Sequence, residues 1–225
     1  LLKSDISKNN IEFPTNLQEL YLNNNFIPSF EFDKYNNLLI LSLEQNMITS
    51  KSLIGEIFPK QLKYLNLDNN QLNIIGITKE TIRDFAYMHK IIILPTSLEF
   101  LSMNSNNLMN YNLHCFNIDQ LSSLRYLSLE DNLLGTYIQI NIVPTNPKLK
   151  ILGLGHNPEL IDLDYIFSGA RGWVWNSYVP IKYLYLNDCK LTDIGVLYKQ
   201  NIIFLNVNNN KLNIDNFLEN QQYAK

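Results

Sequence analysis

The residues of this chain that could carry out nucleophilic, acid–base or metal chemistry are few and scattered. The histidines are His89, His114 and His156, and none has a metal-ligand spacing such as His-x-x-x-His or lies beside a Cys-x-x-Cys pair. Cys115 directly follows His114, but adjacent side chains rarely face each other as a nucleophile and its base must. We therefore expect no enzymatic activity, no metal and no other cofactor.

Composition excludes two further classes of partner. The net charge is −3 at pH 7, without the clustered positive excess of nucleic-acid-binding proteins, so no nucleic-acid partner is expected. Apolar runs such as 91–94 are far too short to cross a bilayer, so no membrane insertion is expected. Two cysteines are too few for a disulfide-stapled secreted domain, and no Asn-x-Ser/Thr sequon occurs. These features favour an intracellular, cytoplasmic protein.

A repeated motif organises the chain, and its clearest copy is QLKYLNLDNNQL at 61–72. Read from Leu62, this copy follows the pattern Leu-x-x-Leu-x-Leu-x-x-Asn-x-Leu. Good copies begin at positions 17, 38, 98 and 124, with LQELYLNNNFI, LLILSLEQNMI, LEFLSMNSNNL and LRYLSLEDNLL. Candidate repeats align on one position, which is occupied in turn by Asn9, Asn25, Asn46, Asn70, Asn106, Asn132, Asn157, Cys189 and Asn210.

The motif predicts one short strand per repeat, because Leu-x-Leu directs alternate side chains to one face. A single repeat cannot bury that face, so successive repeats must stack in parallel. We call the aligned position the ladder position and expect its Asn to satisfy backbone groups in the adjacent turn. Cys189 replaces Asn there, since a thiol is small and is a weak donor. The repeat LGLGHNPEL is irregular, because Pro158 follows the Asn and Leu160 comes one residue late.

The pattern resembles that of leucine-rich-repeat proteins. The irregular intervals, and the prolines Pro14, Pro59 and Pro95 three residues before a first Leu, resemble repeats of bacterial effectors, protists and large DNA viruses. The resemblance implies an α/β solenoid, a horseshoe with a parallel sheet on its concave face and irregular or helical convex returns. We expect one domain over 1–225, with about eight or nine repeats, as part of a longer chain. The short step from Asn9 to Asn25 indicates either a degenerate first repeat or missing residues.

Insertions interrupt the regular spacing. The segment 78–89, TKETIRDFAYMH, has apolar residues at helical spacing and predicts a convex helix. The segment 138–143, IQINIV, is more typical of a strand, and 214–225 predicts the start of another helix. The insertion 166–180 contains both tryptophans, Trp173 and Trp175, which either anchor a partner or another subunit or fold back over the convex side.

The x positions of the strands point away from the core and form columns along the expected concave face. The residue before the second Leu gives an apolar column, which is Glu19, Ile40, Tyr64, Phe100, Tyr126, Ile151, Tyr183 and Phe204. The next column is mostly small and polar and consists of Tyr21, Ser42, Asn66, Ser102, Ser128, Gly153, Tyr185 and Asn206. One margin is often basic (Lys63, Arg125, Lys150, Lys182), and the other is acidic (Glu44, Asp68, Glu130, Asp131, Asp188).

These columns predict a surface that binds a protein or peptide, because aromatic rings supply contact area and opposed charges set orientation. The residues expected to contact the partner are Tyr64, Phe100, Tyr126, Tyr183, Tyr185, Phe204, Lys63, Arg125, Asp68, Glu130, Asp131 and Asp188. The alternative is that the rings only pack on one another along the sheet. Two other functions stay open: the substrate-recognition part of a larger enzyme, such as a ubiquitin ligase, and a structural component of a larger assembly, such as a virion.

Overall fold

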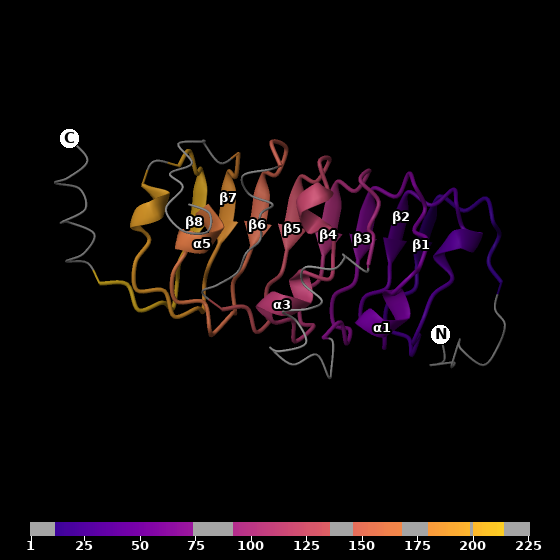
Figure 1. Cartoon of the computed structure of the whole chain (residues 1–225), viewed down its shortest axis with the longest axis horizontal. Helices are drawn as coiled ribbons and strands as arrows, with labels where there is room; N and C mark the ends of the chain where they lie inside the picture. The colour runs from indigo at the N-terminus through magenta and orange to yellow at the C-terminus, as the bar shows by residue number, and fades with distance from the viewer. Residues whose placement is uncertain (1–11, 74–91, 136–145, 168–179, 199, 214–225) are drawn as a thin grey trace.

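The chain forms one parallel sheet of short strands stacked in sequence order (Figure 1). The computed structural model describes residues 12–73, 92–135, 146–167, 180–198 and 200–213. The eight strands in these ranges are β1 Glu19–Tyr21, β2 Ile40–Ser42, β3 Tyr64–Asn66, β4 Phe100–Ser102, β5 Tyr126–Ser128, β6 Ile151–Gly153, β7 Tyr183–Tyr185 and β8 Phe204–Asn206. Each strand pairs with the next in parallel, so the predicted α/β solenoid with a parallel sheet is confirmed.

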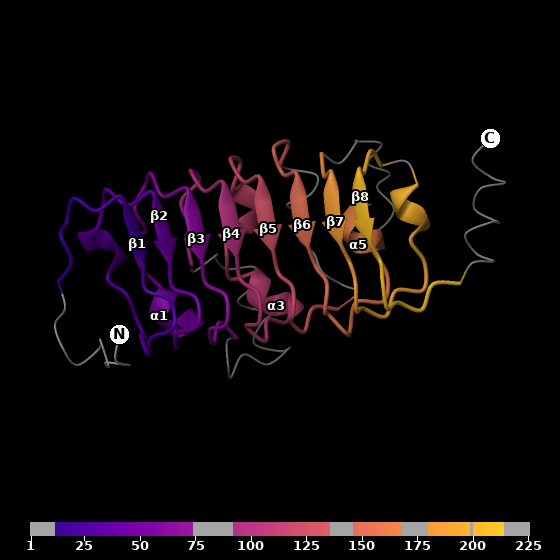
Figure 2. The same ribbon diagram turned by 180° about the vertical axis from the view of Figure 1, so that it is seen from behind.

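The returns between strands are irregular and contain single turns of helix. They include the α-helices α1 Ser50–Leu53, α3 Asn110–Leu113 and α5 Asp164–Phe167, and the 3-10 helices η1 Phe32–Lys34, η2 Ile118–Gln120 and η3 Gly195–Leu197. Helix α1 begins at a capping box, in which Thr49 and Ser52 exchange side-chain to backbone hydrogen bonds, each of 3.1 Å. From behind, Figure 2 shows β1 and β8 at opposite ends of the elongated molecule.

The core lies between the sheet and the returns and is built from the motif leucines. In the repeat at 61–72, the side chains of Leu62, Leu65, Leu67 and Leu72 all have 0% exposure. The repeats between the two ends of the sheet bury the same set against the repeats on either side, as the period requires, whereas Leu205 in the last strand is 37% exposed.

The ladder asparagines hold each repeat to the preceding one. Asn70 Nδ2 donates to the carbonyl oxygen of Leu43 (2.9 Å) in the preceding repeat and to that of Leu67 (3.1 Å) in its own. Its Oδ1 accepts from the backbone N–H of Ile48 at 2.9 Å. One amide side chain therefore pairs backbone donors and acceptors of two repeats inside a buried turn, where unpaired groups would be costly.

The residue before each described ladder position, from Asn25 to Asn210, has left-handed backbone geometry. These residues have φ between 51° and 59°, and they are Asn24, Gln45, Asn69, Ser105, Asp131, His156, Asp188 and Asn209. Asn and Asp are enriched among non-glycine residues with this geometry. Asp131 and Asp188, which the sequence placed on a binding margin, thus also occupy the turn that lets the next residue reach the preceding repeat.

Cys189 occupies a ladder position with fewer groups to satisfy. Its Sγ donates to the carbonyl oxygen of Leu154 at 3.4 Å. The N–H of Leu160, whose counterparts bond to ladder Oδ1 atoms elsewhere, instead donates to the Asn157 carbonyl oxygen at 3.0 Å. The extra residue after Pro158 produces this local bond. A weak donor therefore suffices at position 189, since no backbone N–H there requires the Oδ1 of an asparagine.

Several sequence predictions lie outside the described residues. They are the helix at 78–89, the strand at 138–143, the C-terminal helix at 214–225, the tryptophans Trp173 and Trp175, and the first ladder position, Asn9. The interface hypothesis for the two tryptophans therefore stays a prediction.

Candidate interaction surface

The strand face is the outward side of the sheet, formed by the first and third residue of each strand together with the basic and acidic margins on either side of them. In its centre the aromatic rings stack on one another. The ring centroids of Tyr64 and Phe100 are 4.1 Å apart, those of Phe100 and Tyr126 are 4.2 Å apart, and the ring planes are within 10° of parallel. All three side chains are partly buried. Aromatic packing along the sheet therefore uses much of the ring surface in β3, β4 and β5.

The rings of β7 and β8 are more open. Ile151 separates them from the central stack, and Tyr183 and Phe204 are 40% and 43% exposed. Phe204 contacts Tyr185 of the neighbouring column, with centroids 5.2 Å apart and planes tilted by 43°. These three rings form the exposed aromatic group of the strand face.

The basic margin also differs between its two ends, because its residues beside β3 and β5 have a carboxylate partner and those beside β6 and β7 do not, among the described residues. Glu99 lies between Lys63 and Arg125, with its carboxylate 3.6 Å from Lys63 Nζ and 3.3 Å from Arg125 Nε. Farther along, Lys182 Nζ donates to the neutral carbonyl oxygen of Asn201 at 3.0 Å. Among the described residues, no carboxylate pairs with Lys150 or Lys182. The balance of positive charge therefore lies toward β6 and β7.

Asp68, on the acidic margin, bonds to the next repeat. Its Oδ1 accepts hydrogen bonds from Ser102 Oγ at 2.7 Å and from the Asn104 N–H at 2.6 Å. Burial raises the pKa of Asp68, while these hydrogen bonds oppose the rise. Asn104 acts in the same way one repeat later, because its Oδ1 accepts from Ser128 Oγ and the Glu130 N–H, each at 2.7 Å. Asp68 therefore holds two repeats together.

Glu130 is a half-buried carboxylate whose side chain fills the space over Gly153. A Cβ at Gly153 would lie 2.7 Å from Glu130 Oε1, so glycine makes room for this carboxylate. Burial raises the pKa of Glu130, nearby His156 lowers it and Asp68 raises it further. The charged form of Glu130 is therefore disfavoured by its surroundings in the folded protein.

We expect Glu130→Gln to stabilise the domain slightly near neutral pH, by less than about 1 kcal/mol because the carboxylate is still partly solvated. A carboxyl with a raised folded-state pKa binds its proton more readily in the folded than in the unfolded protein. The Glu130 contribution should thus improve as pH falls from 7 toward about 4.3. Urea unfolding across this range measures both effects. An unchanged pH slope in the variant would show that Glu130 ionises as it does in the unfolded chain.

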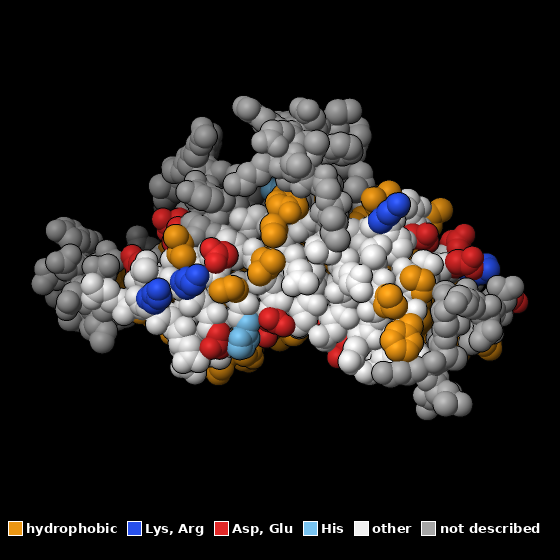
Figure 3. All heavy atoms as spheres, turned by 90° about the horizontal axis from the view of Figure 1, so that it is seen from below, with side chains coloured by type: hydrophobic (Ala, Val, Ile, Leu, Met, Phe, Trp, Pro, Cys, Tyr) orange, Lys and Arg blue, Asp and Glu red, His pale blue; other side chains and the backbone are white. Residues whose placement is uncertain are grey.

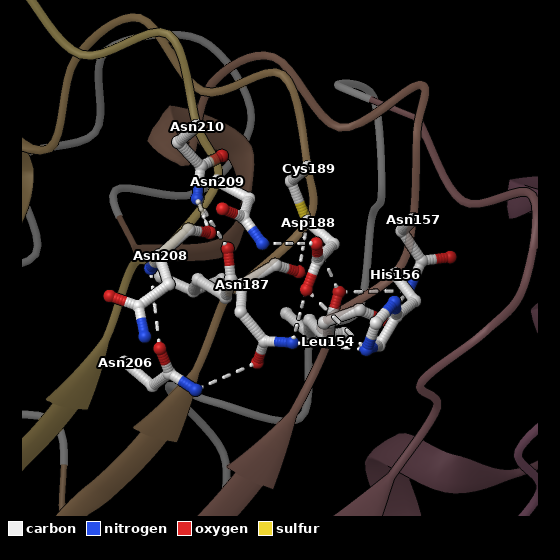
Figure 4. A network of polar contacts seen from close by, with 12 residues as sticks. Leu154, His156, Asn157, Asn187, Asp188, Cys189, Asn206, Asn208, Asn209 and Asn210 are labelled. Atoms are coloured by element: carbon white, nitrogen blue, oxygen red, sulfur yellow. Dashed lines mark hydrogen bonds and ion pairs between the residues drawn. The ribbon is translucent and has the colours of Figure 1, made fainter.

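Asp188 belongs to a polar network at the turn edge of the sheet (Figure 4). Asp188 accepts from Asn187 Nδ2 at 2.8 Å and from Asn209 Nδ2 at 2.7 Å, and these bonds lower its pKa. His156 Nε2 lies 3.5 Å from the same carboxylate. Asp131 accepts from Ser105 Oγ at 2.7 Å. Figure 3, seen from below, shows a histidine side chain between acidic side chains on this edge.

The structure gives little support to other chemistry. Burial raises the pKa of the Cys115 thiol, which disfavours the thiolate that a nucleophile requires, while His114 beside it is exposed. Within the described ranges, no group of three or more His, Cys, Asp or Glu side chains is arranged to hold a metal ion. No helix in the same ranges has the length and apolar character needed to span a bilayer.

The repeated strand, the ladder and the stacked parallel sheet define a leucine-rich-repeat protein, and the chain belongs to this class. It is 30% identical to lumican of Coturnix japonica over 197 residues, which are 81% of this chain and 54% of that protein. It is 28% identical to osteomodulin of Mus musculus over 242 residues, covering 92% of this chain and 56% of that protein. The chain thus spans about half the length of these relatives.

Comparison of folds agrees with this assignment. The crystal structure of internalin C2 from Listeria monocytogenes superposes with a TM-score of 0.60 at 20% identity, covering 87% of this chain and 73% of that one. At this level of identity the similarity concerns the fold. No protein-family profile matches the chain.

The prediction of an intracellular protein is wrong. Lumican and osteomodulin are secreted extracellular-matrix proteins, so the relatives indicate secretion. Few cysteines and missing sequons suggested the cytoplasm, but this fold needs neither disulfides nor glycans to hold its repeats together. Apolar stacking and ladder hydrogen bonds stabilise the repeats without a disulfide, and Cys115 and Cys189 are both free thiols. The cysteine count therefore says little about the compartment of a solenoid.

Proposed function

We propose that this domain is a non-catalytic scaffold that binds a partner protein through its strand face. The observation that carries the proposal is the exposed aromatic group, in which Tyr183 and Phe204 present 40% and 43% of their surface. Large rings that are accessible and rigidly held are the side chains that dominate protein interfaces. The relatives lumican and osteomodulin are leucine-rich-repeat proteins, and similarity to this class supports a protein-binding scaffold.

The scaffold holds these rings in fixed positions. Tyr183 and Phe204 are paired in register on neighbouring parallel strands, so their backbone separation is set by the sheet. The N–H groups of both residues also donate to carbonyls of the preceding repeat, at 3.1 and 2.9 Å. A partner would therefore meet a preorganised surface and lose little affinity to ordering of the receptor.

Peptide display tests this proposal, with a random library selected on the immobilised domain. The peptides selected should bind the double variant Tyr183→Ser/Phe204→Ser about 30-fold or more weakly, because loss of two anchor rings costs at least about 2 kcal/mol. The matched control is Ile57→Ser, which removes an apolar side chain that is 64% exposed on a return segment. Binders that tolerate the double variant but lose affinity with the control would place the binding surface elsewhere and contradict the proposal.

A further inference from the structure

From β3 to β8 the strand face has two halves of three strands each, and these halves differ in how many of their side chains already have partners within the chain. In the half from β3 to β5, the three rings stack on one another, and Glu99 neutralises part of the basic margin. Asp68 is bonded to Ser102 and Asn104. The half from β6 to β8 has exposed rings and lysines without a carboxylate partner among the described residues. Of these two halves, the second therefore has more ring surface and positive charge available to a partner.

Three basic residues occupy the same position in three successive repeats. Lys150 N–H donates to the Arg125 carbonyl oxygen and Lys182 N–H donates to that of Lys150, each at 2.8 Å, so the three residues lie side by side. Neighbouring strands are about 4.8 Å apart, which makes this basic row about 10 Å long. In the described part of the chain, Glu99 is the one carboxylate that contacts the row, at its Arg125 end. The row is thus locally positive on a chain whose net charge is −3.

The exposed rings adjoin this basic row. Tyr183 directly follows Lys182 in the chain, and Phe204 is paired with Tyr183 on the next strand. A ligand that covers the rings must therefore also approach the lysines. Such a ligand would lose affinity if it were basic, because like charges brought together at an interface are strongly unfavourable.

From this arrangement we propose that the strand face from β5 to β8 takes an acidic segment of a partner protein. Carboxylates of the segment pair with Arg125, Lys150 and Lys182, and an apolar or aromatic side chain between them packs on Tyr183 and Phe204. The inference rests on the proposed function and assigns the chemistry of the partner at that same surface.

A protein segment fits this surface better than a sulfated polysaccharide, which also carries negative charge. The opposite margin holds Asp188, whose charged form is favoured by hydrogen bonds from Asn187 and Asn209, and this carboxylate repels a ligand that is negative along its whole length. The rings offer contact area that an apolar side chain uses and a polysulfated chain does not. A segment with closely spaced acidic residues and an intervening Tyr, Phe or Leu would pair with the basic row and also pack on the exposed rings.

The test measures binding of the chain to a random copolymer of glutamate and tyrosine, with a copolymer of lysine and tyrosine and a heparin oligosaccharide as comparison probes. We expect the glutamate copolymer to bind at least about tenfold more tightly than the lysine copolymer at low ionic strength. The double variant Lys150→Glu/Lys182→Glu should lose or invert this preference. Both lysines are at least partly exposed, so melting curves should show that the variant stays folded.

A matched control carries the same change of charge away from the strand face. Lys51→Glu/Lys60→Glu alters two exposed lysines of the return segments and should keep the preference for the glutamate copolymer. The inference is overturned if the glutamate copolymer does not bind, if both double variants weaken it equally, or if heparin alone binds. Display peptides that are neutral or basic yet depend on Tyr183 and Phe204 would overturn the acidic partner and leave the proposed function standing.

Discussion

Replacing Asn132 with leucine is expected to lower the free energy of unfolding by about 3–5 kcal/mol. Asn132 Nδ2 donates to the carbonyl oxygens of Met103, Leu129 and Glu130, each at 3.0 Å. Its Oδ1 accepts from the N–H groups of Asn106 at 3.0 Å and Leu108 at 2.9 Å. Leucine has a similar volume but leaves these backbone groups without their partner in a buried turn. Chemical denaturation followed by circular dichroism measures the loss.

The ladder position occupied by cysteine provides the control for this prediction. Cys189→Ala should cost only about 1 kcal/mol, because it removes one weak donor and leaves the Leu160 N–H bonded to the Asn157 carbonyl oxygen at 3.0 Å. Asn132→Cys should cost clearly more than Cys189→Ala, since it removes the acceptor on which the Leu108 N–H depends. Equal losses at the two positions would mean that the amide oxygen contributes nothing.

The strands and their order were predictable because each copy of the motif contains one Leu-x-Leu strand and successive copies must stack in sequence order. Leu65 and Leu67 must point the same way in an extended chain, and both are fully buried as that argument requires. The reason why Cys189 is tolerated was not predictable in detail. It depends on the path of the backbone after Pro158, where a shift of one residue lets the Leu160 N–H find its acceptor within its own turn. A repeat consensus does not show that the Leu160 N–H will use a backbone carbonyl oxygen as its acceptor in place of a side-chain amide oxygen.

The sequence predicted which residues of the candidate surface align in columns, but it did not predict which of them bond to one another. Spacing alone placed Tyr183 opposite Phe204, because parallel strands in register align equivalent residues. It did not show that the Asp68 carboxylate bonds to Ser102 and Asn104, because that depends on how the side chain turns after the strand ends. One signal was present in the sequence. A polar residue directly follows the last core residue in most repeats, and that regularity is typical of a structural role.

Removing single rings from the aromatic column should show that some of its residues mainly stabilise the fold and others mainly bind the partner. Phe100→Ser is expected to lower the free energy of unfolding by about 2–3 kcal/mol, because it removes two stacked pairs and buried ring area in one step. Those pairs join Phe100 to Tyr64 at 4.1 Å and to Tyr126 at 4.2 Å. Phe204→Ser should cost less than about 1 kcal/mol, because the ring is 43% exposed and has one tilted neighbour, Tyr185.

Urea unfolding of the two variants, combined with their affinity for the selected peptides, distinguishes the two roles. Phe204→Ser should weaken binding more than it weakens folding, and Phe100→Ser should do the reverse. If the two variants instead lose stability and affinity in the same proportion, the column is a single packed stack and the contrast between its halves has no functional meaning. A clear separation would show that one repeated position stabilises the solenoid where its rings have neighbours on both sides. It would also show that the same position is available to a partner where Ile151 interrupts the stack.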